Sequence, residues 1–351
     1  MLFKPTVVQV RGVNGELFTL TDESISGAAI LLRPGAKGLD APSFNVLADE
    51  YPAIDGGFVR FSRATIREIF LPLTITGSTR PEMMALKRRF IAALNPKKGL
   101  VSLQTTEYAE VGGLLVAETP RALTCFYVSG MEGGEGTDDG IHWAKYGLVL
   151  RAPNPYFQHP NRAQGRFQII DVLRPFLDPP SGATPFLSID GVTPGKGLGL
   201  SSDPLWVDTL DLENPGDAEC QPRWEIRGPL SSRMSIVLKD DEGNVVNELR
   251  FTESITIAPN QALVIETTKG SQFARLYPAG ETGDEYDPTQ GDSMWWALDV
   301  TSDLWPIQPG LNHLALQIDK PEDMTPEQEA TWTAANQPLV TVSYFPTFLG
   351  I

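Results

Sequence analysis

Residues Leu212–Pro229, LENPGDAECQPRWEIRGP, join a turn to a short alternating strand. The turn is formed by Asn-Pro-Gly at 214–216, where proline fixes one backbone angle and Asn and Gly tolerate left-handed conformations. Beyond it, the apolar residues Trp224 and Ile226 alternate with charged residues until a Gly-Pro pair ends the strand. This unit is typical of a β-sandwich, and it contains no cluster of reactive side chains.

Similar alternating segments recur along the chain, so the sequence predicts a mainly β protein. In residues 69–75, four apolar side chains occupy alternate positions, which is the period of a strand with one buried face. Pro72 lacks a backbone N–H group, which predicts an edge strand or a bulge there. Further strands are expected at 6–10, 28–32, 58–61, 100–104, 114–118, 121–128 and 143–150, and then at 167–170, 205–210, 223–227, 234–238, 247–251, 254–257, 262–266, 311–318 and 339–344.

Two helices are expected among the strands. Thr79-Arg80-Pro81-Glu82 has the pattern of a capping box and predicts a helix over 80–95, whose apolar stripe packs on a sheet. A second helix is expected at 326–335, within a segment, 321–337, that resembles an insertion before the last strand. Trp332 is its only large apolar residue, so this helix is expected on the surface with Trp332 as its anchor.

A chain of 351 residues exceeds the size at which one hydrophobic core stops growing, which predicts two domains. The segment 151–160, RAPNPYFQHP, contains three prolines and interrupts both patterns. We place the boundary there, with an N-terminal β domain at 1–155 and a β-sandwich at 156–351. A hairpin turn is expected at 239–244 inside the sandwich.

The Gly-rich stretch 130–140, GMEGGEGTDDG, has no apolar periodicity. It is interpreted either as a mobile hairpin tip or as an arm that orders against a neighbouring subunit. Exposed strand edges and such arms are the surfaces through which β proteins pair. The candidate assembly residues are therefore Pro72, Met131, Glu132, Gly133, Gly134, Glu135, Gly136, Thr137, Asp138 and Asp139.

The chain has 44 acidic and 28 basic residues, a formal charge of −16, which disfavours binding to nucleic acid. The basic run 87–89 is interpreted as a solvated helix face, with an anion or acidic-partner site as the alternative. Residues 1–10 lack the apolar core of a secretory signal, and no apolar run is long enough to span a membrane.

Catalytic and metal-binding patterns are missing from the sequence. Histidine occurs only at positions 142, 159 and 313, without a G-x-S-x-G motif or paired metal-ligand spacing. Cys125 is expected to be a buried apolar residue, and Cys220 lies in a turn; together they encode no disulfide framework. The Gly-rich segments lack the spacing of phosphate loops. We therefore expect no enzymatic activity, no cofactor and no metal.

Two binding alternatives stay open. The acidic loop 281–287, ETGDEYD, offers oxygen ligands for calcium, although solvated turn acids are the simpler interpretation. Trp295, Trp296 and Trp305 are candidate glycan contacts, because exposed aromatic faces hold sugars in many β-sandwiches. Adjacent residues on a strand face opposite ways, which predicts that one of Trp295 and Trp296 is in the core and the other is covered by a loop.

Several stretches resemble the distal tail proteins of siphophages, the phage tail family. They are GFVRFSRATIREIFLPLTITG at 57–77, the capped helix, residues 143–150, RAPNPYF at 151–157, NPGDAECQPRWEIRGP at 214–229 and SDLWPIQPGLNHLAL at 302–316. Each is a turn-and-strand pattern, and their order along the chain strengthens the resemblance.

The resemblance implies an N-terminal β-barrel or sheet domain with one packed helix, followed by a galectin-like β-sandwich. It also implies a structural protein of the virion, in which six copies form a ring that joins the tail tube to the tail-tip adsorption apparatus and leaves a lumen for DNA. The implied partners are further copies of the chain, the tail-tube protein and tail-tip proteins, with synthesis in the host cytoplasm and no membrane. A carbohydrate-binding module that recognises host cell-wall glycans is the alternative function.

Overall fold

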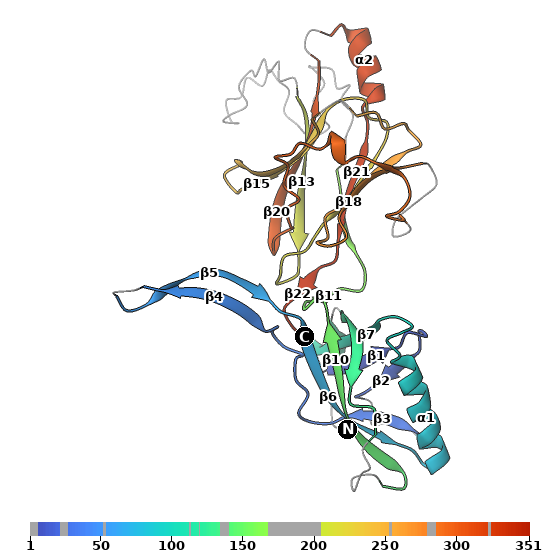
Figure 1. Ribbon diagram of the computed structural model, residues 1–351. Coiled ribbons are helices and arrows are strands. Elements are labelled where there is room, and N and C mark those ends of the chain that lie inside the picture. The colour runs from blue at the N-terminus through green and yellow to red at the C-terminus, as the bar shows by residue number, and fades with distance from the viewer. Residues whose placement is uncertain are drawn as a thin grey trace. The chain divides into compact units, whose positions relative to one another are not determined.

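The computed structural model describes residues 6–21, 27–51, 54–111, 114–118, 120–133, 140–167, 205–252, 255–278, 286–321 and 324–351 (Figure 1). The chain forms two compact units. Unit 1 consists of Met1–Asn161, Gly216–Ala218 and Phe345–Ile351, and unit 2 consists of Arg162–Pro215 and Glu219–Tyr344. Both units are built mainly from antiparallel strands, which confirms the predicted mainly β class.

Unit 1 contains a nearly closed barrel. Its strands follow the order β2-β1-β7-β9-β10-β6-β3, and the Leu32 N–H group donates to the carbonyl oxygen of Leu20 at 2.6 Å where the two ends of the sheet approach. Apolar residues on alternate positions fill the interior, as the period-two pattern predicts. The strands are β1 (Thr6–Arg11), β2 (Leu17–Thr19), β3 (Ala29–Leu32), β6 (Arg67–Thr76), β7 (Val101–Val111), β9 (Arg121–Ser129) and β10 (Trp143–Ala152). A further strand, β8 (Leu114–Ala117), pairs with β7 only.

Helix α1 (Arg80–Ala93) packs on this barrel. Thr79 and Glu82 form the predicted capping box, each side chain accepting a hydrogen bond from the backbone N–H group of the other residue. Met83 and Phe90 are buried in the barrel core, and the Phe90 ring lies 5.0 Å from that of Phe18 in an edge-on arrangement. The helix therefore closes one side of the core, as its apolar stripe predicts.

The last strand of unit 1 comes from the far end of the sequence. Strand β22 (Thr347–Phe348) pairs with β11 (Phe157–Gln158), which also pairs with β9. Phe157 and Phe348 are both buried in the barrel core. The structure thus differs from the sequence-based division, which gave all of 156–351 to the second domain, because no local pattern reveals a pairing across almost 200 residues.

Unit 2 is a two-layer β-sandwich. One sheet has the order β12-β21-β14-β17-β18-β19 and the other β13-β20-β15-β16. Both sheets contribute to one buried core, in which Trp224 and Ile226 point inward as their alternation predicts. The strands are β12 (Ala163–Arg166), β13 (Leu205–Asn214), β14 (Arg223–Arg227), β15 (Met234–Lys239), β16 (Val245–Arg250), β17 (Ala262–Glu266), β18 (Phe273–Tyr277), β19 (Asp292–Ser293), β20 (Gly310–Asp319) and β21 (Leu339–Tyr344).

Two local predictions for unit 2 are confirmed. The turn between β15 and β16 is closed by Asp240, whose carboxylate accepts from the N–H group of Asn244 at 2.7 Å. Helix α2 (Pro326–Ala335) begins with a capping box of Thr325 and Gln328. Its Trp332 is partly buried against the sandwich core and donates its indole N–H to Ser232 Oγ at 3.0 Å, so it is the expected anchor.

Candidate assembly surface

A two-stranded arm projects from the barrel of unit 1 (Figure 1). It consists of β4 (Phe44–Glu50) and β5 (Gly57–Ala64), which pair with each other and with no other strand of the described chain. The register shifts between Leu47 and Ala48, where Arg60 is the extra residue of a β-bulge. At the base of the arm, the Thr65 N–H group donates to the carbonyl oxygen of Ser43 at 2.8 Å.

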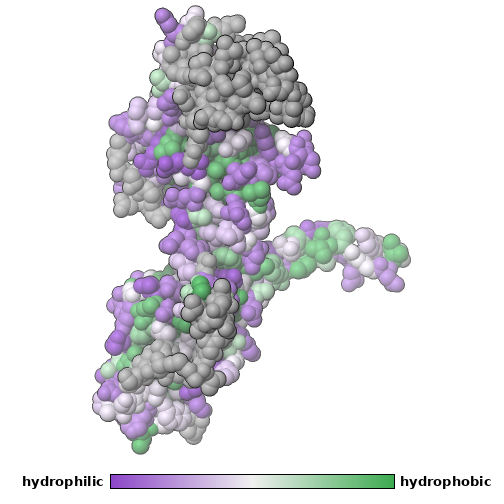
Figure 2. Space-filling model, turned by 180° about the vertical axis from the view of Figure 1, so that it is seen from behind, coloured by the Kyte–Doolittle hydropathy of each residue, from purple (hydrophilic) through white to green (hydrophobic). Residues whose placement is uncertain are grey.

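The arm exposes large apolar side chains on both of its faces. Six of them have between 44% and 61% of their surface exposed, and the hydrophobic colour follows the arm in Figure 2. A lone two-stranded hairpin is marginally stable in water, and contiguous apolar patches on a protein surface mark interaction sites. The arm is therefore suited to burial against another surface. The six residues are Phe44, Val46, Leu47, Phe58, Val59 and Phe61.

The charges of the arm are unevenly placed. Asp49 pairs with Arg60 across the bulge, and the Tyr51 ring packs 6.0 Å from the Phe58 ring. Toward the tip, the exposed carboxylates of Glu50 and Asp55 form no ion pair within the described chain. The tip of the arm is consequently acidic as well as apolar.

An apolar groove of about 590 Å³ lies on the outer face of β3, β6 and β10. Leu31, Pro72 and the 37% exposed ring of Trp143 give it an apolar lining. Arg33 and Lys145 add positive charge: the Arg33 Nε donates to Thr74 Oγ1 at 3.1 Å, and the Lys145 ammonium lies 5.2 Å from the Trp143 ring centroid. Neither cation has a carboxylate partner among the described residues.

Pro72 does not lie on an edge strand, so that alternative is wrong, whereas the pairing on its β3 side is irregular, as the bulge alternative predicts. Strand β6 is paired with β10 on one side and β3 on the other, and its register with β10 has no shift. The Pro72 carbonyl accepts from the Arg33 N–H group at 2.8 Å, one residue after β3 ends. Because the N and O of one residue in an antiparallel strand face the same neighbour, the missing donor faces the side on which β3 stops. The pairing on that side resumes at the bridge between Lys37 and Phe70, and the Pro72 side chain lines the groove.

The Gly-rich stretch is described only in part, since positions 134–139 lie outside the described residues. Its first residues form a fixed turn, because the Glu132 carboxylate accepts from the Gly130 N–H group at 2.6 Å and from the Tyr127 hydroxyl at 2.9 Å. The pKa of Glu132 is lowered by a hydrogen bond from its own backbone N–H group, and further by those from Tyr127 and Gly130. Met131 is 5% exposed and packs in the barrel core, which leaves Glu132 and Gly133 as the exposed residues of this turn.

The three tryptophans proposed as glycan contacts have different environments. Trp305 is 4% exposed and packs 6.0 Å from the Trp224 ring in the sandwich core, so its role is structural. Trp295 and Trp296 lie on a short 3₁₀-helix, η2 (Trp295–Ala297), and are 42% and 62% exposed. The prediction that one of the pair is buried and the other covered is wrong, because it assumed a strand where the chain forms a helical turn.

Candidate catalytic and metal-binding groups are dispersed. Over the described ranges, no three His, Cys, Asp or Glu side chains are placed to hold a metal ion. His159 bonds locally with Asn161, whereas His313 lies 2.7 Å from Asp211. Cys125 and Cys220 are free and buried, and burial raises the pKa of each thiol to about 12. Within the same ranges, no helix is long and apolar enough to cross a membrane.

The proposed calcium loop is only partly described, because positions 281–285 lie outside the described residues. The Asp287 carboxylate accepts from the N–H group and the hydroxyl of Thr289, at 2.8 and 2.7 Å. These bonds lower the pKa of Asp287. The Tyr286 hydroxyl donates to Glu225 at 3.1 Å, and burial raises the pKa of Tyr286 to about 12. Both residues thus have structural partners within unit 2.

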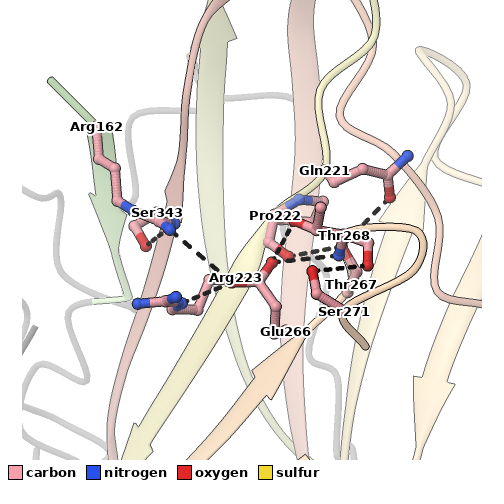
Figure 3. Close-up of polar contacts among 9 residues, drawn as sticks. All are labelled: Arg162, Gln221, Pro222, Arg223, Glu266, Thr267, Thr268, Ser271 and Ser343. Atoms are coloured by element: carbon pink, nitrogen blue, oxygen red, sulfur yellow. Dashed lines mark hydrogen bonds and ion pairs between the residues drawn. The ribbon is translucent and has the colours of Figure 1, made fainter. Parts of the chain in front are cut away.

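A buried polar cluster in unit 2 holds the end of β17 (Figure 3). The carboxylate of Glu266, which is 4% exposed, lies 2.8 Å from the Arg223 Nε and 3.8 Å from the Arg162 guanidinium. It also accepts from the Thr268 hydroxyl at 2.6 Å, while the Thr267 hydroxyl donates to the carbonyl oxygen of Pro222 at the same distance. The cluster ties the residue before β12 to strands β14 and β17.

The arm is the feature that sequence reasoning missed. Residues 58–61 were expected to form a strand, but their partner β4 was not, because Val46 and Leu47 are adjacent apolar residues that break the alternation before the bulge. A usable signal was the large number of apolar residues in 44–61 for a segment with no predicted place in either core.

The fold is similar to that of a solved phage tail protein. The crystal structure of the Dit protein (gp 19.1) of SPP1, described as a paradigm of the hub adsorption apparatus in phages infecting Gram-positive bacteria, matches with a TM-score of 0.55 and 14% identity. The match covers 98% of this chain and 100% of that chain. The phage P2 baseplate in its activated conformation, with Ca or with Sr, matches with TM-scores of 0.43 and 0.44 at 11% and 12% identity, over 91% of this chain and 99% of the other.

No family model and no curated protein matches the sequence. The predicted resemblance to siphophage distal tail proteins is confirmed at the level of the fold. Since one fold supports many functions, the role of this chain has to be argued from its surfaces.

Proposed function

We propose that the protein is a structural subunit of a siphophage tail tip, a distal tail hub that joins the tail tube to the host-adsorption apparatus. The observation that carries this proposal is the match to SPP1 Dit, which extends over both units and covers all of that chain. In this role the protein turns over no substrate and needs no cofactor. Its place is the tail tip of the virion, between the tail-tube protein and tail-tip proteins.

The arm supports an assembly role. Its apolar side chains lie outside both large hydrophobic cores, so folding of one chain leaves them in water. Assembly of several copies covers them. A ring needs two different surfaces on each subunit, one that donates and one that receives, and a rotation that closes. Six copies around an open lumen are the proposed arrangement, and the formal charge of −16 on each chain favours passage of DNA without adhesion.

Native mass spectrometry of the full chain tests the proposal. A six-fold species, seen as rings by electron microscopy, is the expected result. A variant in which residues 46–62 are replaced by a Gly-Gly turn should stay monomeric and melt at the wild-type temperature, because none of the described residues of that segment belongs to the barrel core. A wild-type chain that stays a single copy up to hundreds of micromolar, alone and with purified tail-tube protein, would contradict the assembly role.

Glycan recognition by unit 2 is a second candidate function. It is favoured by the rings of the consecutive residues Trp295 and Trp296, which are both exposed, and by Val300, four residues further along the chain, which is 99% exposed. Aromatic faces of this kind stack on the apolar faces of sugars. Binding to host cell-wall glycans on an array, lost in the Trp296→Ala variant and kept in Leu311→Ala, is the expected result. Equal binding by both variants, or none by the wild type, would exclude this site.

A further inference from the structure

We infer that the groove on the outer face of β3, β6 and β10 receives the tip of the β4–β5 arm from a second copy of this chain. The inference rests on the proposed function, because it supplies the receiving surface that a ring of identical subunits requires. The partner is a second copy of the same protein. In the contact, a hairpin with apolar and acidic side chains lies in a groove with apolar and basic side chains.

The arm tip and the groove have complementary chemistry. The arm tip combines apolar and aromatic side chains with the carboxylates of Glu50 and Asp55, which have no cationic partner in the described chain. The groove combines Trp143 and Pro72 with the cations of Arg33 and Lys145, which have no anionic partner there. Docking would bury apolar surface on both sides and pair these charges across the interface.

Within one copy, the base of the arm and the groove lie near opposite ends of β6. The arm leaves the barrel just before Arg67, where β6 begins, whereas the groove lies around Pro72–Thr76, near the other end of the same strand. Five to nine residues of strand separate them, about 15 to 30 Å at roughly 3.3 Å per residue. The arm extends away from its own barrel (Figure 1). An arm on one copy is therefore placed to reach another copy rather than its own groove.

The arm is long enough for this contact. Strand β4 has seven residues and β5 has eight, which gives a reach of roughly 25 Å at about 3.3 Å per residue. Each copy then gives one arm and accepts one arm, so the contact is heterologous and repeats from subunit to subunit. The bulge at Arg60 twists the arm, which orients the two apolar faces differently along its length.

Cysteine trapping tests the contact directly. One chain carries Asp55→Cys at the arm tip, and a second chain carries Thr76→Cys in the groove. The native Cys125 and Cys220 are 0% and 3% exposed, and burial raises the pKa of each to about 12, so they contribute little thiolate to cross-linking. Mixing the two chains with a short bismaleimide should give a covalent heterodimer. The chain with both substitutions should give a ladder of higher oligomers.

The matched control replaces Thr76→Cys by Lys97→Cys, which lies in an exposed loop after α1, away from the groove. That pair should not cross-link above the level of random collision. Equal yields from the groove and control pairs would overturn the inference. An Asp55→Cys homodimer as the main product would also overturn it, because it would mean that arms meet arms.

Charge reversal provides an independent readout. Arg33→Glu with Lys145→Glu should abolish the oligomer seen by native mass spectrometry, and adding Glu50→Lys with Asp55→Lys in the same chain should restore it. Reversal of the exposed pair Lys97 and Lys98 changes the net charge equally and should have no effect. Assembly that is indifferent to reversal at Arg33 and Lys145 would contradict the proposed contact.

The results separate this inference from the proposed function. A six-fold ring without arm-to-groove cross-links leaves the hub role standing and removes the contact. Specific cross-links that form only open chains keep the contact and remove the closed ring. A wild-type chain that neither assembles nor cross-links removes both.

Discussion

The guanidinium of Arg121 lies over the ring of Phe348, with 4.3 Å between the guanidinium carbon and the ring centroid, and donates a hydrogen bond to the carbonyl oxygen of Gly350 at 2.6 Å. A second cation, the buried Arg67, donates to the carbonyl oxygen of Leu349 and lies 5.1 Å from the Phe157 ring centroid. Two arginines from the N-terminal part of the chain thus hold its last described strand in the barrel of unit 1.

Phe348→Ala should destabilise unit 1 by about 3–5 kcal/mol, the usual cost of removing a buried phenylalanine. Phe348 is 7% exposed and belongs to the barrel core, so the lost packing leaves a cavity beside β11. Hydrogen exchange of the β11 and β9 amides in urea measures the change. Leu311→Ala, at a 58% exposed position, is the control and should change stability by less than about 0.5 kcal/mol. Unchanged hydrogen-exchange protection of β11 in Phe348→Ala would show that β22 contributes little to the stability of unit 1.

Glu266→Ala should lower the free energy of unfolding of unit 2 by about 3–5 kcal/mol, the range for breaking a buried ion pair. The side chain is 6% exposed, and its removal leaves the cations of Arg223 and Arg162 buried without this carboxylate. Urea unfolding followed by tryptophan fluorescence measures the loss. Asp303→Ala, at an exposed position, serves as the control. A loss below about 1 kcal/mol would mean that water or other groups replace the carboxylate.

Trp305→Ala and Trp296→Ala should separate the core tryptophan from the surface tryptophan. The first should cost about 3–5 kcal/mol, because Trp305 is 4% exposed against Trp224. The second should change stability by less than about 0.5 kcal/mol, since Trp296 is 62% exposed. Thermal melting of both variants checks this difference. Similar melting temperatures would contradict the placement of Trp305 in the core.

The pKa of His313 is raised from its ordinary value of 6.5, mainly by its hydrogen bond to Asp211, with smaller contributions from the charges of Asp211 and Asp241. Because the folded state holds the proton more tightly, the stabilisation is complete below about pH 6.5 and is lost as pH rises through the folded pKa. A wild-type minus His313→Gln difference in melting temperature should therefore be largest at acidic pH and vanish at alkaline pH. NMR titration of the imidazole, repeated in Asp211→Asn, checks the cause: the pKa should fall toward its ordinary value, and a pKa that stays at the wild-type value in that variant would contradict it.

Local features of the fold were predictable because their causes lie within a few residues. The capping box at Thr79–Glu82 contains both partners of its own hydrogen bonds. The alternation of Trp224 and Ile226 with charged residues indicates which face of β14 is buried. The same reasoning located the 239–244 turn and the anchor Trp332.

Features that depend on distant pairing were not predictable. The pairing around Pro72 depends on where β3 stops. The part of the barrel core beside β11 depends on β22, which follows β11 by almost 200 residues. Trp295 and Trp296 were misplaced because a helical turn and a strand impose different directions on adjacent side chains. The arm escaped notice because nothing local distinguishes an apolar strand that faces solvent from one that faces a core.

The position of β22 at the end of the sequence affects how unit 1 folds during synthesis. Residues 345–351 emerge from the ribosome only after all of unit 2, so the core of unit 1 beside β11 stays incomplete while the sandwich is still being translated. Until then Phe157 lacks its partner and Arg67 and Arg121 lack their carbonyl acceptors. A nascent chain stalled anywhere in the sandwich thus lacks part of the core of unit 1, which gives the cell a physical basis for telling unfinished copies from finished ones.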